Sequence, residues 1–471
     1  MTNWLPDLTL GSGPLYLRLA DQIEHDIERG VLAPGAKLPP QRNLAFDIGV
    51  TIGTISRAYA LVRERGLVSG EVGRGTYVLS AEPAGSETER SLAAPFGGTR
   101  DAVIEPGKLR LDSSAAPEIG QAAELERLTR AILRDRPDEI ASYTRTLPPD
   151  WLTAGCAWLS HAGWTPRPES IVPTLGGHAG ILAVMAAMTV PGDRIAFESL
   201  TYSHVARSGS VIGRRAVPVS IDAHGMIPDD LERVCAQQHP KVVFLVPSLH
   251  NPTLATMPED RRQAVVDIAR RHNVWLIEDN IYGALLDTPP IPLAALAPER
   301  TFHVGSLSKS VAAGVRGGWI SCPPHQASRV LTAHKMITGG MPFLLAELAA
   351  QLVTSGAAET LRQRVRAEIG RREGHARRAF EGYDIASHPA APFVWLKLPE
   401  PWLSSTFKNA ASEDGVLIDD EDEFKVGQAE TALHRVRISF SVPANTASLD
   451  GGLSVLRRLL DNPICGFDNY G

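Results

Sequence analysis

The amino-acid sequence predicts an α/β body with a mostly parallel sheet, preceded by a winged helix-turn-helix domain. The body is predicted by continuous apolar runs at residues 241–247, 273–279 and 301–305, because strands buried on both faces have this pattern. Helical patterns lie between the runs, so strands and helices alternate as they do around a parallel sheet. Three helical patterns followed by a hairpin pattern within residues 1–80 predict the N-terminal domain.

The two parts are separated by residues 81–107, a stretch rich in Ala, Pro, Gly, Ser and Glu without periodicity. Such a composition is typical of a linker. The chain is therefore expected to divide into a domain of residues 1–80, this linker and a body of residues 108–471.

Composition and charge exclude several classes of protein. No apolar run reaches the length of a membrane span and no signal-peptide pattern opens the sequence, so we expect a cytoplasmic protein that does not enter membranes. The four cysteines have neither metal-ligand nor disulfide spacing, and no metal site is expected. A net charge of −6 gives no general affinity for nucleic acid, so DNA binding requires a local site.

Each element of residues 1–80 carries a local signal. Apolar residues four apart along residues 15–27 predict the first helix, and Pro39 and Pro40 open the second. Thr51 is a favourable N-cap for a third helix, which precedes two short strand patterns joined by a Gly-rich turn. This order of elements is that of a winged helix-turn-helix.

The third helix of such a domain lies in the major groove of DNA, and the wing reaches phosphates or the minor groove. Glycines in the wing allow the backbone to approach the duplex closely. A small helical domain that contacts another protein is the alternative interpretation of the same pattern. The residues expected at the DNA are Arg42, Thr54, Ser56, Arg57, Arg74 and Gly75.

Polar residues follow the predicted strands of the body. Asn251 follows the first apolar run, Asp279 ends the second, and Lys309 follows the third within the sequence SLSKS. A glycine pair at residues 176–177 follows a fourth strand pattern and opens a helix, whose N-terminal amides suit a phosphate. Because ligands bind at the carboxyl ends of such strands, we expect these groups to share one site.

Pyridoxal 5′-phosphate is the cofactor that this set of residues fits. Lys309 is the predicted catalytic residue, whose amine would form a Schiff base with the cofactor aldehyde. Asp279 would pair with the pyridine nitrogen, and Asn251 and Tyr282 would bind the ring oxygen. Tyr202 would stack on the ring. The predicted phosphate ligands are Ser306, Ser308, Arg316 and the amides of Gly177 and His178.

The N-terminal part resembles the DNA-binding domain of the GntR family from Pro14 onwards. The resemblance rests on the stretches PGAKLPPQR, GVTIGTISRAY and GRGTYV. It implies that Arg42, Thr54, Arg57 and Gly75 lie at the DNA. Many members of the family have a basic residue where this sequence has Ile52.

The body resembles fold-type I aminotransferases through the stretches TLGGHAG, LHNP, EDNIYG, SLSKSVAAGVR and RVRISFS. The resemblance implies that Arg437 binds the carboxylate of a substrate or effector. Tyr143 matches an early tyrosine of the family, but the Gly and Leu-Arg that usually follow it are lost. Whether Tyr143 contacts the cofactor across a dimer therefore stays open.

Together the two parts resemble the MocR family of transcription regulators. This implies a homodimer that binds double-stranded DNA and whose body senses an amino compound, or pyridoxal phosphate itself, and so changes operator affinity. Two alternatives stay open. The chain could be an active pyridoxal-phosphate-dependent aminotransferase with an accessory DNA-binding domain, or a DNA-binding protein whose body holds no cofactor.

Overall fold

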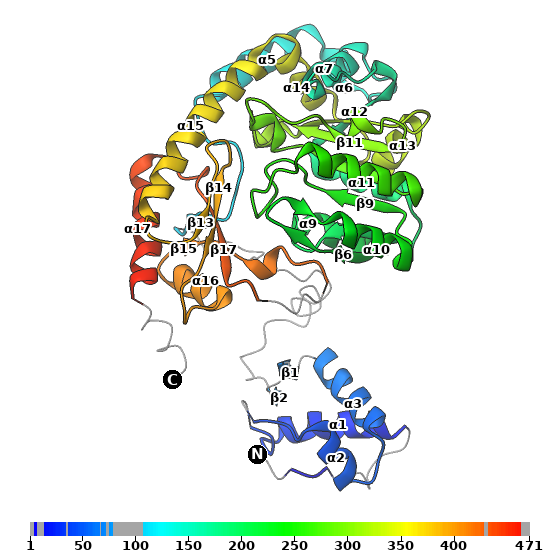
Figure 1. The fold of residues 1–471 in the computed structure, drawn as a ribbon, viewed down its shortest axis with the longest axis vertical. Helices are drawn as coiled ribbons and strands as arrows, with labels where there is room; N and C mark the ends of the chain where they lie inside the picture. Colours follow the sequence, from blue (N-terminus) through cyan, green and yellow to red (C-terminus); the bar gives the residue numbers. More distant parts are fainter. Residues whose placement is uncertain are drawn as a thin grey trace. The chain divides into compact units, whose positions relative to one another are not determined.

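A computed structural model describes residues 4–6, 14–33, 36–65, 67–71, 75–78, 107–427 and 432–462. The chain forms two compact units that divide between Pro95 and Phe96 (Figure 1). Apart from Gly107, the expected linker at 81–107 lies outside the described residues. None of the helices in the described ranges is both long and apolar enough to cross a membrane.

The first unit has the predicted order of three helices and a hairpin. Ile23 on the first helix packs with Ile55 and Tyr59 on the third in one apolar core. Thr51 caps the third helix, since its Oγ1 accepts a hydrogen bond from the backbone nitrogen of Thr54 at 3.3 Å. The elements are α1 (Leu15–Glu28), α2 (Gln41–Asp47), α3 (Ile52–Glu64), β1 (Val68–Glu71) and β2 (Gly75–Val78).

The second unit is built around a seven-stranded sheet in the order β4-β12-β11-β10-β9-β5-β6. The three predicted apolar strands are neighbours in it, and β9, β10 and β11 run parallel. β12 runs antiparallel to both of its neighbours, β4 and β11. Arg316, with a φ of 55°, turns the chain into β12. The strands are β4 (Ile171–Leu175), β5 (Arg194–Glu198), β6 (Arg215–Val219), β9 (Val242–Leu245), β10 (Trp275–Asp279), β11 (Thr301–Ser306) and β12 (Gly317–Ser321).

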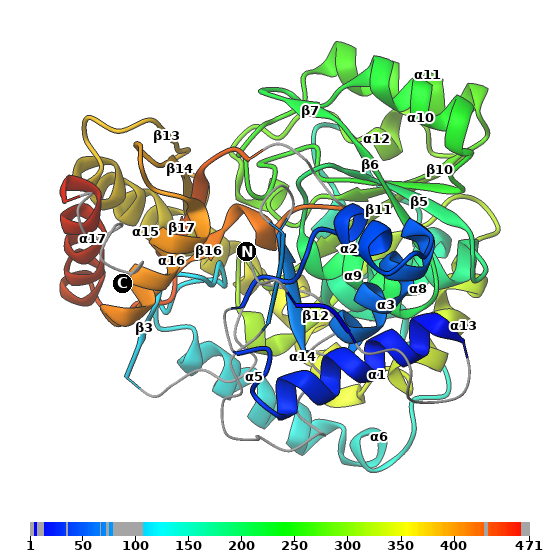
Figure 2. The ribbon, with the colours of Figure 1, turned by 90° about the horizontal axis from the view of Figure 1, so that it is seen from below.

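Helices cover both faces of this sheet (Figure 2). One apolar core joins α8, α9 and α13 to the strands, and a second joins α10, α11 and α12 to the opposite face. Both faces are therefore buried, which explains the uninterrupted apolar runs of the strands. The helices are α8 (Gly176–Met188), α9 (Ser203–Val211), α10 (Pro228–Gln238), α11 (Glu259–Arg271), α12 (Leu293–Leu296) and α13 (Ala327–Thr338).

A third core lies at the β4 and β12 side of the sheet. Trp151 donates a hydrogen bond to Glu347 at 2.8 Å, and Trp319 of β12 donates one to the backbone oxygen of Trp151 at 2.9 Å. These bonds satisfy the polar atoms of large buried side chains. The helices here are α5 (Ala122–Asp135), α6 (Pro137–Ala141), α7 (Pro149–Leu159) and α14 (Phe343–Thr354).

A smaller antiparallel sheet, in the order β13-β14-β17-β16, forms the remainder of the second unit. Its core is shared with the long helix α15, which runs from beside α14 towards α17 (Figure 1). A separate parallel pair joins β3 to β15. These elements are β3 (Leu109–Arg110), α15 (Ala357–Ala379), β13 (Ile385–Ala386), β14 (Phe393–Lys397), α16 (Ser404–Glu413), β15 (Val416–Leu417), β16 (Asp419–Asp420), β17 (Arg435–Ser439) and α17 (Thr446–Asp461).

Candidate functional site

One cavity of about 160 Å³ in the second unit is lined by the polar residues that follow the strand ends. All eleven residues that the sequence assigned to the cofactor or to a carboxylate line it. Their individual roles stay predictions. They are Gly177, His178, Tyr202, Asn251, Asp279, Tyr282, Ser306, Ser308, Lys309, Arg316 and Arg437.

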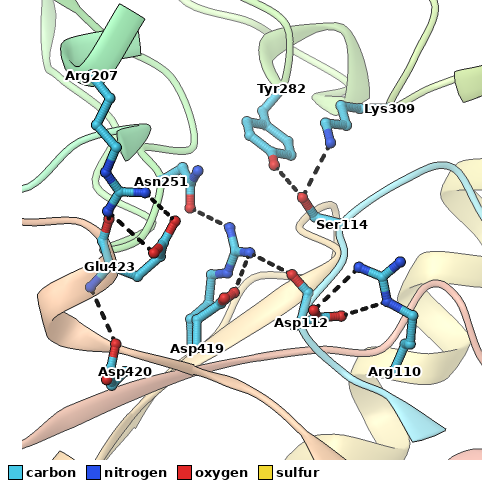
Figure 3. Close-up of polar contacts among 11 residues, drawn as sticks. Arg110, Asp112, Ser114, Arg207, Asn251, Tyr282, Lys309, Asp419, Asp420 and Glu423 are labelled. Carbon is cyan, nitrogen blue, oxygen red and sulfur yellow. Dashed lines mark hydrogen bonds and ion pairs between the residues drawn. The ribbon is translucent and has the colours of Figure 1, made fainter. Parts of the chain in front are cut away.

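Lys309 reaches into this cavity just beyond β11. Its Nζ donates a hydrogen bond to Ser114 Oγ at 3.3 Å and lies 5.9 Å from the ring centre of Tyr282. Ser114 Oγ also shares a hydrogen bond of 2.6 Å with the Tyr282 hydroxyl (Figure 3). A single serine thus holds the amine and the phenol beside each other.

Asp279 ends β10 and is buried at the base of the cavity. Its Oδ1 accepts a hydrogen bond from the backbone nitrogen of Ile281 at 3.0 Å. Burial raises the pKa of Asp279 to about 6, although that hydrogen bond and the positive charge of Lys309 act in the opposite direction. A buried carboxylate of this kind gains stability from a cationic partner.

Backbone and hydroxyl donors gather where α8 begins. Gly176 has a φ of 75°, and a Cβ on Gly177 would lie 2.3 Å from Ile281 Cδ1, so the turn needs glycine. Ser306 Oγ lies 3.0 Å from Ser308 Oγ. Since the N-terminal amides of a helix attract anions, this end of the cavity suits a phosphate.

Two aromatic rings border the same end. The rings of His178 and Tyr202 meet edge to face, with centres 5.8 Å apart. His178 Nε2 lies 3.1 Å from Ser208 Oγ, and its buried Nδ1 has no hydrogen-bond partner among the described residues. Burial lowers the pKa of His178 to about 4, so this ring is neutral at pH 7.

Arg437 comes from β17 of the smaller sheet and closes the cavity from the opposite side. Its guanidinium donates to Asn251 Oδ1 at 2.7 Å and to Asp419 Oδ2 at 2.6 Å. The rings of Phe393 and Phe424 lie 5.2 and 4.8 Å from it. Arg437 is thus fixed by a carboxylate of this chain and enclosed by aromatic rings.

The first unit exposes three of the side chains expected at DNA. Arg42 on α2 and both Ser56 and Arg57 on α3 are exposed, while Thr54 is half-buried. The Arg57 guanidinium lies 5.4 Å from the ring centre of Tyr16. Gly75 begins β2, and Arg74 lies outside the described residues.

Comparison with known proteins identifies both units. Residues 15–78 match the family described as bacterial regulatory proteins, gntR family, and residues 106–448 match aminotransferase class I and II. A Bacillus subtilis protein named uncharacterized HTH-type transcriptional regulator YdeF is 32% identical over 462 residues, which cover 98% of this chain and 97% of that protein. The chain belongs to the MocR-type transcription regulators of the GntR family.

Other relatives agree with this assignment. The MocR-type chain is 28% identical over 380 residues to the pyridoxine biosynthesis regulator PdxR of Corynebacterium glutamicum, with 77% of this chain and 79% of that protein covered. In fold it is similar to an archaeal alanine:glyoxylate aminotransferase, with a TM-score of 0.68 and 23% identity over 75% of this chain and 91% of the other. The second unit therefore has the fold of a fold-type I aminotransferase, a class that uses pyridoxal 5′-phosphate.

Sequence reasoning missed part of the MocR-type site. Asp112, Ser113 and Ser114 line the cavity, as does Phe424. These serines follow β3, a strand of two residues whose partner β15 lies far along the chain. No local pattern marks such a strand, so only the pairing itself reveals where Ser114 lies. Tyr143 is 90% exposed and does not line the cavity.

Proposed function

We propose that this regulator binds pyridoxal 5′-phosphate at Lys309 and converts the occupancy of the cavity into a change of DNA affinity. The observation that carries the proposal is the convergence of Lys309, Asp279 and Arg316 on one cavity of a chain that also has a winged helix-turn-helix. An amine, a buried carboxylate and a guanidinium match the aldehyde, the ring nitrogen and the phosphate of this cofactor.

The residues at the ring end fit the cofactor. The raised pKa of Asp279 marks a buried carboxylate that a protonated pyridine nitrogen would stabilise. Tyr282 lies beside the Lys309 amine through Ser114, where its hydroxyl can donate to the ring oxygen. Asn251 lines the same part of the cavity. When bound, the cofactor supplies an aldehyde that captures amines and a ring that withdraws electrons.

The residues at the other end fit a phosphate. The amides of Gly177 and His178 open α8, which has no side-chain cap of its own. Ser306 and Ser308 add hydroxyl groups, and Arg316 adds a guanidinium suited to two phosphate oxygens. The opposite sheet contributes Arg437, so the cavity lies where the two sheets of the second unit meet.

This position suggests how a ligand changes DNA affinity. A ligand that contacts both sheets favours the arrangement in which they are closed, because it binds that arrangement more tightly. We propose a homodimer in the cytoplasm, so that two winged helices bind two half-sites of one operator. The coupling between ligand and DNA is expected to be about 1–3 kcal/mol, or about 5- to 150-fold in affinity. The effector is an amino compound or pyridoxal phosphate itself.

The test is a gel-shift titration on DNA upstream of the protein's own gene, with and without pyridoxal phosphate and candidate amines. Lys309→Ala should keep its affinity for DNA but lose both the visible absorbance band of the bound cofactor and the response to it. Lys335→Ala, on the exposed side of α13, is the control and should behave as the wild type. A normal response in Lys309→Ala would contradict the proposal.

Catalytic turnover is the second candidate, and a specific observation favours it. Both Lys309 and Asp279 face one cavity, as transamination requires of its amine and its ring partner. Multiple-turnover assays with an amino donor and a keto acceptor decide between the two. A regulator should complete at most one exchange per site, whereas an enzyme should continue until the donor is consumed.

A further inference from the structure

Residues Asp419–Glu423, here called the acidic segment, are five consecutive acidic residues beside the cavity. Four of them are buried, and Asp422 alone is exposed. Phe424, the next residue, lines the cavity. Because buried carboxylates require partners, the contacts of this segment determine the charge of the surrounding site.

Asp419 neutralises Arg437. The two residues are directly opposite each other in the antiparallel pairing of β16 and β17, and their ion pair is 2.6 Å long (Figure 3). Both side chains are almost completely buried, at 2% and 0% exposure for Arg437 and Asp419. Turning Asp419 away would leave a buried carboxylate without its cation, which is strongly unfavourable. The pair is therefore a fixed part of the sheet.

Glu423 neutralises a second guanidinium in the same way. Arg207 of α9 lies 2.9 Å from its Oε1 and also donates to its backbone oxygen at 3.0 Å. Glu423 is completely buried and Arg207 is 24% exposed. α9 directly follows Tyr202 of the cavity, so this cation too is compensated close to the site.

We propose that the cavity selects an amine that lacks a carboxylate, because Asp419 of the acidic segment has already neutralised Arg437, the residue of the cavity that was expected to bind one. This inference rests on the proposed function and names the class of effector. Among the described residues that line the cavity, only Lys309, Arg316 and Arg437 carry a positive charge. In the proposed function the first two would bind the aldehyde and the phosphate of the cofactor, and the third is paired with Asp419.

A ligand carboxylate would therefore enter a site whose nearest guanidinium already has an anion at hydrogen-bond distance. It would be repelled by Asp419 and would lose its hydration without gaining an uncompensated cation. An amine without a carboxylate meets neither penalty. The acidic segment thus weakens the binding of zwitterionic amino acids, and it also fixes the position of Arg437.

The test uses the full chain loaded with pyridoxal phosphate and measures equilibrium dissociation constants by calorimetry. Two matched pairs are compared: 1,5-diaminopentane with L-lysine, and propylamine with 4-aminobutanoate. In both pairs the member without a carboxylate should bind about tenfold more tightly or better. Equal binding, or tighter binding of the carboxylates, would overturn the inference.

Asp419→Asn supplies the second measurement, because it removes the charge but keeps a side-chain oxygen for Arg437. The preference within each pair should fall by about tenfold, the change expected when one like charge is removed. Asp422→Asn is the matched control on the same segment, since Asp422 is 51% exposed and pairs with Lys425, which does not line the cavity. An unchanged preference in folded Asp419→Asn contradicts the inference. If that variant does not fold, the two ligand pairs measured on the wild-type protein decide the inference by themselves.

The absorbance band of the bound cofactor separates this inference from the proposed function. If pyridoxal phosphate produces no band with wild-type protein, the proposed function fails and the inference fails with it. If the band forms and L-lysine binds as tightly as 1,5-diaminopentane, the cofactor assignment stands and only the charge selection is wrong.

Discussion

Asp279 illustrates how a single residue can fit a proposed ligand at the expense of the stability of the free protein. Its carboxylate is buried, and the raised pKa means that its charged form is disfavoured in the folded state. The folded protein therefore binds a proton at Asp279 more tightly than the unfolded chain does. The corresponding stability is present below the unfolded pKa and is lost as the pH rises through about 6.

Asp279→Asn should accordingly stabilise the protein when no cofactor is bound. At pH 7.5 the urea midpoint of the cofactor-free variant should lie above that of the wild type, and the difference should shrink as the pH falls from 6 towards 4. The same substitution should weaken pyridoxal phosphate binding, because Asn carries no charge for the ring nitrogen. Urea unfolding at several pH values and a cofactor titration measure both effects. A lower midpoint at pH 7.5 would contradict the argument.

At the scale of elements, the start of α8 decides the shape of the cavity end where we propose that the phosphate binds. The chain passes from β4 directly into α8, and Gly177 is packed against Ile281. Ile281 itself lines the cavity, so any group added at Gly177 forces that side chain to move within the site. The packing between helix and strand end therefore also sets the shape of this end of the cavity.

Gly177→Ala tests this fit. The added methyl group should weaken pyridoxal phosphate binding by about tenfold, since overpacking of this kind costs about 1–3 kcal/mol. Gly451→Ala in α17 is the control, because a Cβ there meets nothing within 4 Å. Titration of the absorbance band measures both variants. Unaltered cofactor affinity in Gly177→Ala would show that Ile281 can move without cost.

The sequence predicted some elements well and others not at all. β9, β10 and β11 are apolar throughout because both faces of their sheet are covered, so the runs at 241–247, 273–279 and 301–305 marked them directly. The four-stranded sheet was not predicted, because β13 and β16 have only two residues each. Strands of two residues are too short to show an alternating apolar pattern, and they are defined only by their pairing with other strands.

At the scale of the whole molecule, the two units have separate cores. The apolar core of the first consists of residues between Trp4 and Val78, and every other core cluster consists of residues beyond Lys108. A domain with its own core can fold by itself. The division between Pro95 and Phe96 falls inside the stretch that the sequence predicted as a linker.

A chain of residues 96–471 should therefore fold and retain the cofactor band, but should no longer bind DNA. The full chain should bind with an affinity that falls steeply with salt, as phosphate contacts require. Absorbance and gel-shift measurements on both chains test this. A truncated chain that still shifted operator DNA would place a nucleic-acid site in the second unit.

The sequence by itself determined the classes of the two units, because buried parallel strands and amphipathic helices are encoded by local patterns. It also determined the residue types of the cavity, since strand ends can be located once the strands are known. Only the tertiary structure decided that Ser114 holds Lys309 and Tyr282 together, and that Asp419 faces Arg437. The Ser114 contacts join segments far apart in the chain. The energy of all these contacts depends on burial and charge, which no local pattern specifies.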